Sequence, residues 1–93
     1  MTLTYKSDPY TYELLELASL GNNHHTVRIT ISQKRAWRAP LVTTVDLFCH
    51  STEIHDNTRW YYQDDGSEFD HSRWAVNDLV TRYLRLERFH QVD

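Results

Sequence analysis

The stretch TRWYYQDDGSEFDH, residues 58–71, concentrates the carboxylates that could carry chemistry in this chain. A calcium loop of the helix-loop-helix type needs oxygen ligands at positions 1, 3, 5 and 12 and a glycine at position 6. With Gly66 at position 6, position 1 is Tyr61 and position 12 is Ser72, so two of the required carboxylate ligands are missing. An acid/base pair is no better supported, because nothing in a solvated turn raises a carboxyl pKa toward neutrality. We therefore interpret this stretch as a turn and not as a metal or catalytic loop.

Histidines raise the possibility of a metal site, and the chain has six of them: His24, His25, His50, His55, His71 and His90. Zinc sites use short paired spacings such as C-x-x-C or a helical H-x-x-x-H, and neither occurs. A folded site combining His24 or His25 with His50 and His55 stays open. Cys49 falls mid-strand on the expected core face, where a thiol lacks the electropositive setting of a nucleophile. The sequence predicts no metal, no cofactor, no catalytic residue and a protein that is not an enzyme.

Length and charge bound the remaining functions. The 93 residues fit one domain, residues 1–93, with a modest core. No apolar run reaches the length of a membrane span, no apolar leader is present, and the single cysteine suits a reducing compartment, so we expect a cytoplasmic protein. The net charge of −3 is uneven: residues 24–50 hold four Lys and Arg against one carboxylate, and residues 51–70 hold one Arg against six carboxylates.

Two helices are expected to position these groups. The segment 8–20 resembles a helix, with Asp8 as N-cap, Pro9 in the first turn and Gly21 as the C-terminal stop. The segment 72–90 has a clear helical period, and Asp70 or Ser72 would cap it. Its apolar stripe is Val76, Leu79, Val80, Tyr83 and Leu86. Three aromatic residues are assigned to the core: Tyr83 of this stripe, Trp74 and Phe69.

Strands fill the middle of the chain. Residues 25–33 alternate, with Val27, Ile29 and Ile31 on one face. Residues 40–50 form a second β-branched run, and the loop KRAWRA joins the two. Asp65-Gly66 predicts a type I′ turn that pairs residues 59–64 with residues 67–70. The expected fold is α+β, in the order α-β-β-β-α, with a three- to four-stranded antiparallel sheet and two helices packed on one face.

Aromatic and charged residues suggest two binding surfaces, since Trp, Tyr and Arg dominate interface hot spots. The first would bind a protein or nucleoprotein partner that has a basic surface, and it consists of Trp37, Trp60, Tyr62, Asp64, Asp65 and Glu68. The second would bind RNA or DNA through the basic loop 33–38 and the last helix, with Lys34, Arg35, Arg38, Arg82 and Arg85 as contacts. The sequence leaves the oligomeric state open.

The favoured interpretation is a small, non-enzymatic, macromolecule-binding protein that acts through the aromatic and acidic surface. In being small, acidic, rich in aromatics and without a known motif, the chain is similar to phage-encoded inhibitors of host machinery, including anti-CRISPR proteins. That similarity implies a cytoplasmic inhibitor whose partner is a host protein or nucleoprotein. An RNA- or DNA-binding accessory domain is the alternative.

Overall fold

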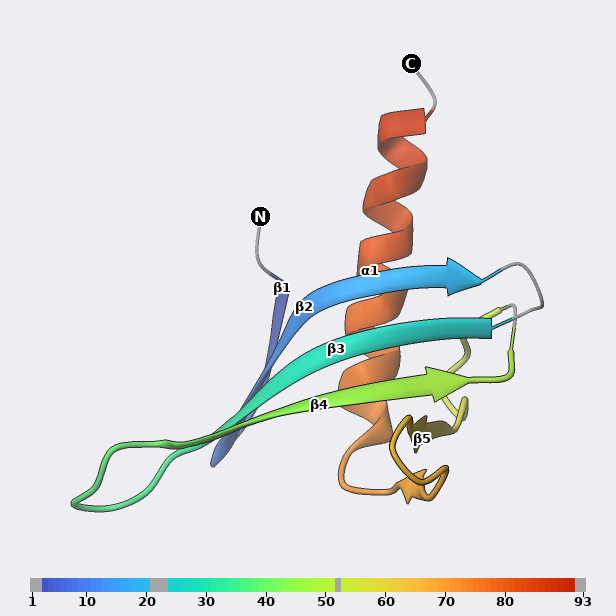
Figure 1. The fold of residues 1–93 in the computed structure, drawn as a ribbon. Helices are drawn as coiled ribbons and strands as arrows, with labels where there is room; N and C mark the ends of the chain where they lie inside the picture. The colour runs from blue at the N-terminus through green and yellow to red at the C-terminus, as the bar shows by residue number, and fades with distance from the viewer. Residues whose placement is uncertain (1–2, 21–23, 52, 92–93) are drawn as a thin grey trace.

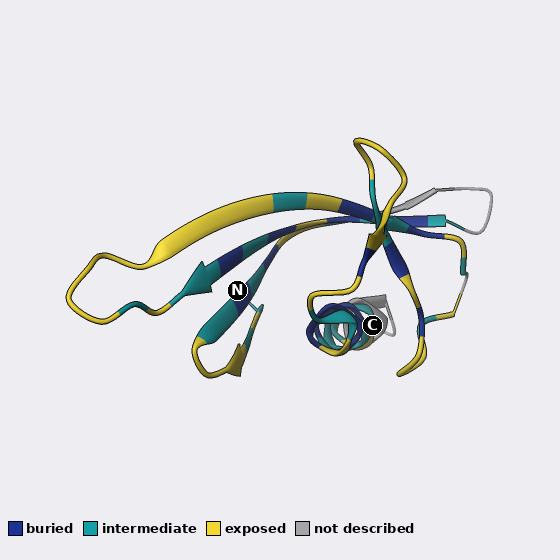
Figure 2. Ribbon diagram, turned by 90° about the horizontal axis from the view of Figure 1, so that it is seen from below, coloured by how far each residue is buried: buried dark blue, intermediate teal, exposed yellow. Residues whose placement is uncertain are grey.

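The computed structural model describes residues 3–20, 24–51 and 53–91. Six strands form one antiparallel sheet in chain order: β1 (Leu3–Ser7), β2 (Tyr10–Leu20), β3 (His24–Gln33), β4 (Leu41–Cys49), β5 (Trp60–Tyr62) and β6 (Glu68–Phe69). A single helix, α1 (Arg73–Gln91), follows them. The helix crosses one face of the sheet and leaves the other face open (Figures 1 and 2). The architecture is α+β, but the expected sheet of three to four strands with two helices is wrong.

The helix expected over residues 8–20 is strand β2, and a β-bulge explains the error. Tyr12 and Leu14 alternate toward the core as in any strand. The register then shifts between Leu14 and Glu16, so the next residue on that face is Leu17, opposite Val27. One extra residue therefore turns a period of two into a spacing that resembles a helix. The expected stop at Gly21 lies outside the described residues.

The start of β2 is a turn and not a helix N-terminus. The Asp8–Pro9 peptide bond is cis and lies between β1 and β2, which pair from Leu3 with Leu14 to Ser7 with Tyr10. Asp8 is therefore a turn residue rather than an N-cap. The short N-terminal strand β1 was not expected at all, because five residues with mixed polarity carry little periodic signal.

The other predicted elements are present. Val27, Ile29 and Ile31 of β3 are buried, as the alternation predicts. Helix α1 begins after Ser72, whose hydroxyl accepts a hydrogen bond from the Ala75 amide at 3.4 Å, so Ser72 is the cap. The core between sheet and helix consists of Tyr12, Leu14, Val27, Ile29, Ile31, Leu47, Cys49, Trp60, Phe69, Ala75, Val76, Leu79 and Val80.

The turn between β5 and β6 is longer than the predicted type I′ turn. Gly66 has a φ of 74°, but Asp65 does not have the positive φ that a type I′ turn requires. The Tyr62 amide donates to the Ser67 carbonyl at 2.8 Å, and the Gly66 amide donates to the Tyr62 carbonyl at 2.9 Å. The predicted pairing of the two strands is confirmed, with Trp60 opposite Phe69. The turn rises on the open side of the sheet, away from α1 (Figure 2).

Candidate functional site

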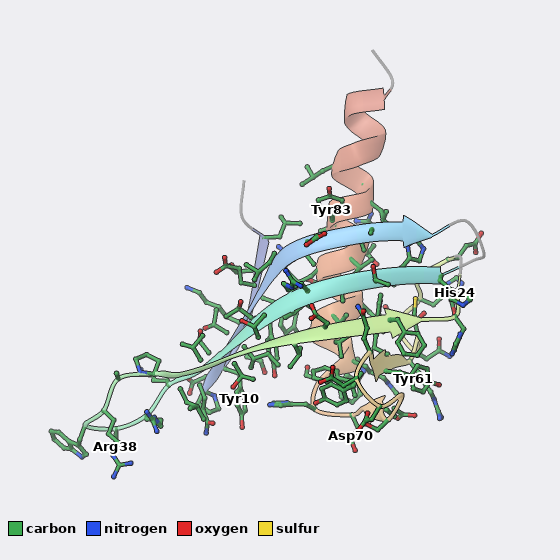
Figure 3. All side chains as sticks on the ribbon, viewed as in Figure 1. Tyr10, His24, Arg38, Tyr61, Asp70 and Tyr83 are labelled. Carbon is green, nitrogen blue, oxygen red and sulfur yellow. The ribbon has the colours of Figure 1, made fainter. Side chains whose placement is uncertain are left out.

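The most prominent surface feature is an arm, residues 32–42, made by the ends of β3 and β4 and the loop between them. The arm extends away from the body of the protein (Figures 1 and 3). Trp37 lies in this loop with its side chain fully exposed and a φ of 66°. Among the described residues it is the only non-glycine residue with a positive φ. A bulky residue in this conformation is strained, and such strain is typical of functional loops.

The arm is held in one shape by backbone contacts. The β3–β4 ladder continues to the pair of Gln33 with Leu41. Beyond it, the Arg35 guanidinium donates two hydrogen bonds to the Ala39 carbonyl, at 3.1 and 2.9 Å. At the base, the Lys34 amide donates to the Pro9 carbonyl in the β1–β2 turn at 2.8 Å. The loop is therefore preorganised, which reduces the entropy lost on binding.

The arm carries only positive charge. Residues 17–45 contain no Asp or Glu, so nothing within the arm neutralises its cations. Lys34 and Arg38 are exposed and form no ion pair within the described part of the chain. Arg38 extends from the tip into solvent (Figure 3). An exposed indole between unpaired cations fits phosphate contact combined with base stacking.

Two aromatic residues are placed differently from the expectation. Trp60, expected on the partner surface, is completely buried, and its indole N–H donates to the Asn77 amide oxygen at 2.6 Å. It therefore cannot contact a partner. Trp74, expected in the core, is 59% exposed, with the Arg73 guanidinium 5.2 Å from its ring centroid. Tyr62 is half-buried beside Phe69, with ring centroids 5.6 Å apart.

Local bonds engage two of the three predicted acidic contacts. The Asp65 carboxylate accepts from the Ser67 amide at 2.9 Å and from the Ser67 hydroxyl at 2.7 Å, and these bonds lower the pKa of Asp65. Glu68 pairs with Arg59 at 3.3 Å. Asp64 is exposed and has no ion pair within the described residues. The predicted acidic surface therefore reduces to Asp64 with two neighbours that already have partners.

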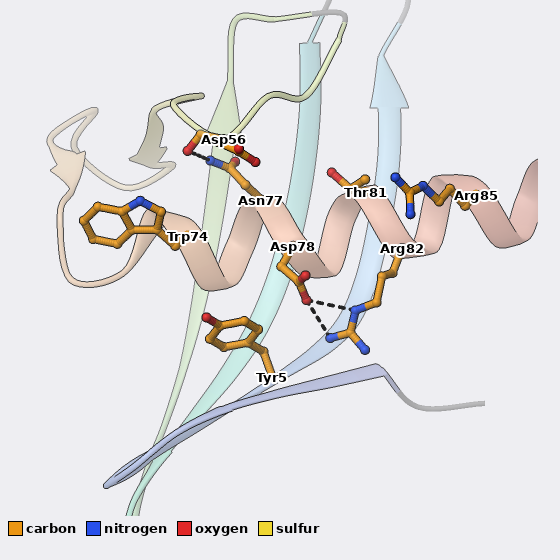
Figure 4. A pocket seen from close by; sticks show the side chains of 8 residues that line it. All are labelled: Tyr5, Asp56, Trp74, Asn77, Asp78, Thr81, Arg82 and Arg85. Atoms are coloured by element: carbon orange, nitrogen blue, oxygen red, sulfur yellow. Dashed lines mark hydrogen bonds and ion pairs between the residues drawn. The ribbon is translucent and has the colours of Figure 1, made fainter.

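The two predicted arginines of α1 border an open hollow of about 430 Å³ on the solvent side of the helix (Figure 4). Arg82 pairs with Asp78 at 2.8 Å and donates to the Thr4 carbonyl of β1 at 2.5 Å. Arg82 thus ties the helix to the edge strand, which is a structural role. Arg85 is exposed beside it. Figures 1 and 3 place α1 far from the arm tip, so the predicted basic residues do not form one surface.

The described residues contain no group of three or more His, Cys, Asp or Glu side chains that could hold a metal ion. His24 and His50 approach each other, with ring centroids 5.2 Å apart. His25 and Cys49 instead face the core, where both are buried. Burial raises the pKa of the Cys49 thiol, so this group is unsuited to nucleophilic attack at neutral pH. The side chain of His90 lies outside the described residues.

A row of rings on the open face was not assigned a function from the sequence. It contains Phe48, His50 and Tyr61, with His24 next to His50. The alternation of residues 40–50 placed Phe48 and His50 on the face opposite Leu47 and Cys49, which was the available signal.

Comparison of the chain with protein families, with curated proteins and with solved structures finds no match. None of the helical structure described forms a segment long and apolar enough to cross a membrane.

Proposed function

We propose that this protein is a non-enzymatic binder of nucleic acid and that the arm is its contact element. The observation that carries the proposal is the fully exposed Trp37, held at a φ of 66° between Lys34 and Arg38. The indole offers a stacking surface for a base, and the two cations lie close enough in the chain to contact neighbouring phosphates.

Comparison with the other predicted surface favours the arm. In the predicted acidic surface, Trp60 is buried in the core. Asp65 is hydrogen-bonded to Ser67, and Glu68 is paired with Arg59. In the arm, Lys34, Trp37 and Arg38 are exposed, and only Arg35 is engaged, by its two hydrogen bonds to the Ala39 carbonyl. The net charge of −3 argues for local contact at the tip rather than for bulk attraction to a polyanion.

The remaining expectations stay predictions. Asp64 still supports binding to a protein or nucleoprotein with a basic surface. A role as a phage-type inhibitor of host machinery, such as an anti-CRISPR protein, is compatible with an arm that occupies a groove of its target. The single, buried Cys49 supports a cytoplasmic setting.

The test is a titration of labelled oligonucleotides, single-stranded and duplex, at several salt concentrations. Each phosphate contact contributes about −0.7 to the slope of log K against log salt on single strands and about −0.9 on duplex. Lys34→Ala combined with Arg38→Ala should therefore weaken binding and flatten the slope by about 1.4 or about 1.8.

Two control variants test whether the effect is local to the arm. Arg85→Ala removes an exposed cation of α1, and Trp74→Ala removes an exposed indole of α1. Neither should change affinity or slope appreciably, whereas Trp37→Ala should weaken binding. Absence of salt-dependent binding by the parent protein, or equal losses in arm and control variants, would refute the proposal.

A further inference from the structure

The open face of the sheet carries a cluster of rings, here called the ring platform: His24, Phe48, His50 and Tyr61. Ring centroids lie 5.1 Å apart for Phe48 and His50, 5.5 Å for His50 and Tyr61, and 5.7 Å for Phe48 and Tyr61. His24 and Tyr61 lie at the end of the sheet remote from the arm (Figure 3).

The ring platform is separate from the core under α1. Leu47, Cys49 and Trp60 are completely buried, so strand alternation directs Phe48 and Tyr61 to the opposite face. Phe48 and Tyr61 are half-buried, and His50 is exposed. Cross-strand pairing of Phe48 with Tyr61 is an ordinary stabilising contact within a sheet. It does not explain why the imidazoles of His24 and His50 lie beside this pair.

The charged groups near the ring platform are largely neutralised in pairs. Arg28 pairs with Asp46 at 2.8 Å and approaches Glu16 at 3.8 Å. Arg59 pairs with Glu68 at 3.3 Å. Two acidic groups on this side, Glu13 in β2 and Asp64 in the β5–β6 turn, form no ion pair within the described residues.

A continuous path leads from the ring platform to the arm along β3. The residues of β3 that alternate with its buried positions are Thr26, Arg28, Thr30 and Ser32. The Thr30 hydroxyl lies 3.4 Å from the Thr44 hydroxyl of β4. The path therefore presents hydroxyls, which suit sugar and phosphate contacts, and the guanidinium of Arg28, which lies between the carboxylates of Asp46 and Glu16. At about 3.3 Å per residue, the ten residues of β3 span about 33 Å.

We propose that the ring platform stacks unpaired bases and that the nucleic acid bound by this protein is single-stranded, lying along β3 from the ring platform to the arm. This inference depends on the proposed function of the arm. In a duplex each base already stacks on its neighbours, so its face is not available to a ring on a sheet. A single strand can turn its bases out onto aromatic side chains while its backbone follows charged and hydroxyl groups.

The experiment compares binding of an oligothymidine of about 12 nucleotides with binding of a duplex of similar length, both fluorescently labelled. The platform variant is Phe48→Leu with Tyr61→Leu, which removes both rings but keeps apolar side chains in the strands. Loss of one stacked base should weaken binding of the single strand by between about 5- and 150-fold. Binding of the duplex should change less than twofold.

Matched variants separate this inference from the proposed function. Lys34→Ala combined with Arg38→Ala should weaken binding of both oligonucleotides, because both carry phosphates. Trp37→Ala should weaken binding of the single strand, and Trp74→Ala should weaken neither. If the platform variant binds the single strand as tightly as the parent while Trp37→Ala does not, the inference is overturned and the proposed function stands. If the parent binds neither oligonucleotide, both fall, and the ring platform is better assigned to contact with a protein. Far-ultraviolet circular dichroism of the platform variant confirms that lost binding is not lost folding.

Discussion

Replacing Trp37 with glycine should stabilise the fold while removing the side chain on which binding depends. Trp37 has a φ of 66°, a left-handed conformation that costs an L-residue roughly 1–2 kcal/mol. Its side chain is fully exposed, so no packing offsets this strain. Glycine removes the strain but gives the unfolded chain extra freedom, which costs about 0.4–1 kcal/mol. The net expectation is a gain of about 0.5 kcal/mol in the free energy of unfolding.

Urea denaturation measures this gain against Trp37→Ala as the matched variant. Alanine removes the indole but keeps the β-carbon, so the strain persists and stability should equal that of the parent. In a domain of this size, 0.5 kcal/mol corresponds to a rise of about 2–4 °C in Tm. Both variants should lose affinity for nucleic acid to the same extent, because both lack the indole.

Two results would refute the reasoning. If Trp37→Gly is less stable than Trp37→Ala, the backbone of the parent is not strained at this position. If both variants bind nucleic acid as tightly as the parent, the indole is not an anchor, and the strain has no role in binding. A stabilised variant that has lost binding would indicate that the loop retains strain for function.

Two further perturbations test the framework that positions the surfaces. Asn77→Ala leaves the buried Trp60 indole N–H without its acceptor, and it removes the two hydrogen bonds that the Asn77 side chain donates to backbone carbonyls. The free energy of unfolding should therefore fall by about 3 kcal/mol in urea denaturation. An unchanged denaturation midpoint would contradict this expectation. The hydrogen bonds from Ser67 lower the pKa of Asp65 in the folded protein. They therefore stabilise the fold fully above the pKa that Asp65 has in the unfolded chain. This stabilisation is lost as the pH falls through the lower pKa of the folded protein. The Ser67 resonances should follow that acid titration by NMR and should stop doing so in Asp65→Asn.

Periodicity predicted the parts of the fold in which one period runs without interruption. Strand β3 alternates over its length, and α1 keeps its stripe through Val76, Leu79 and Val80. Strand β2 contains a bulge after Leu14, and a bulge is a property of the pairing with β3 that the chain alone does not reveal. The helix prediction failed there because the shifted apolar positions also satisfy a helical spacing.

The placement of the tryptophans shows which signal deserved more weight. Trp74 is four residues before Asp78 and seven before Thr81, so the helical period puts all three on one side of α1. That side borders the open hollow of Figure 4. Residue type favoured the core for Trp74, but the period correctly indicates the surface. The side of Trp60 could not be predicted, because a three-residue strand has too little alternation to identify its buried face.

The candidate site was predicted in composition but not in arrangement. The basic loop with Trp37 was visible as a cluster in the sequence, and its exposure is confirmed. Its projection as an arm was not predicted, because the sequence does not reveal how far the paired ends of β3 and β4 extend beyond the part of the sheet that α1 covers. The separation of Arg82 and Arg85 from the arm also follows from three-dimensional packing, which joins α1 to β1 through the Thr4 carbonyl.

The charge of Asp64 distinguishes nucleic-acid binding from binding to a basic protein. Asp64 is exposed in the β5–β6 turn, and this turn lies on the open side of the sheet (Figure 2). Asp65 holds the turn through Ser67 and should be left unchanged. Asp64→Lys replaces a charge that repels a phosphate backbone with one that attracts it, and an exposed turn charge contributes little to stability. Oligonucleotide affinity should therefore rise, and the salt slope should steepen by up to about 0.7 on single strands. Asp64→Asn should give a smaller rise and no added slope. If Asp64→Lys leaves oligonucleotide binding unchanged but abolishes binding to a basic protein, the acidic turn is the contact surface and the arm proposal is wrong.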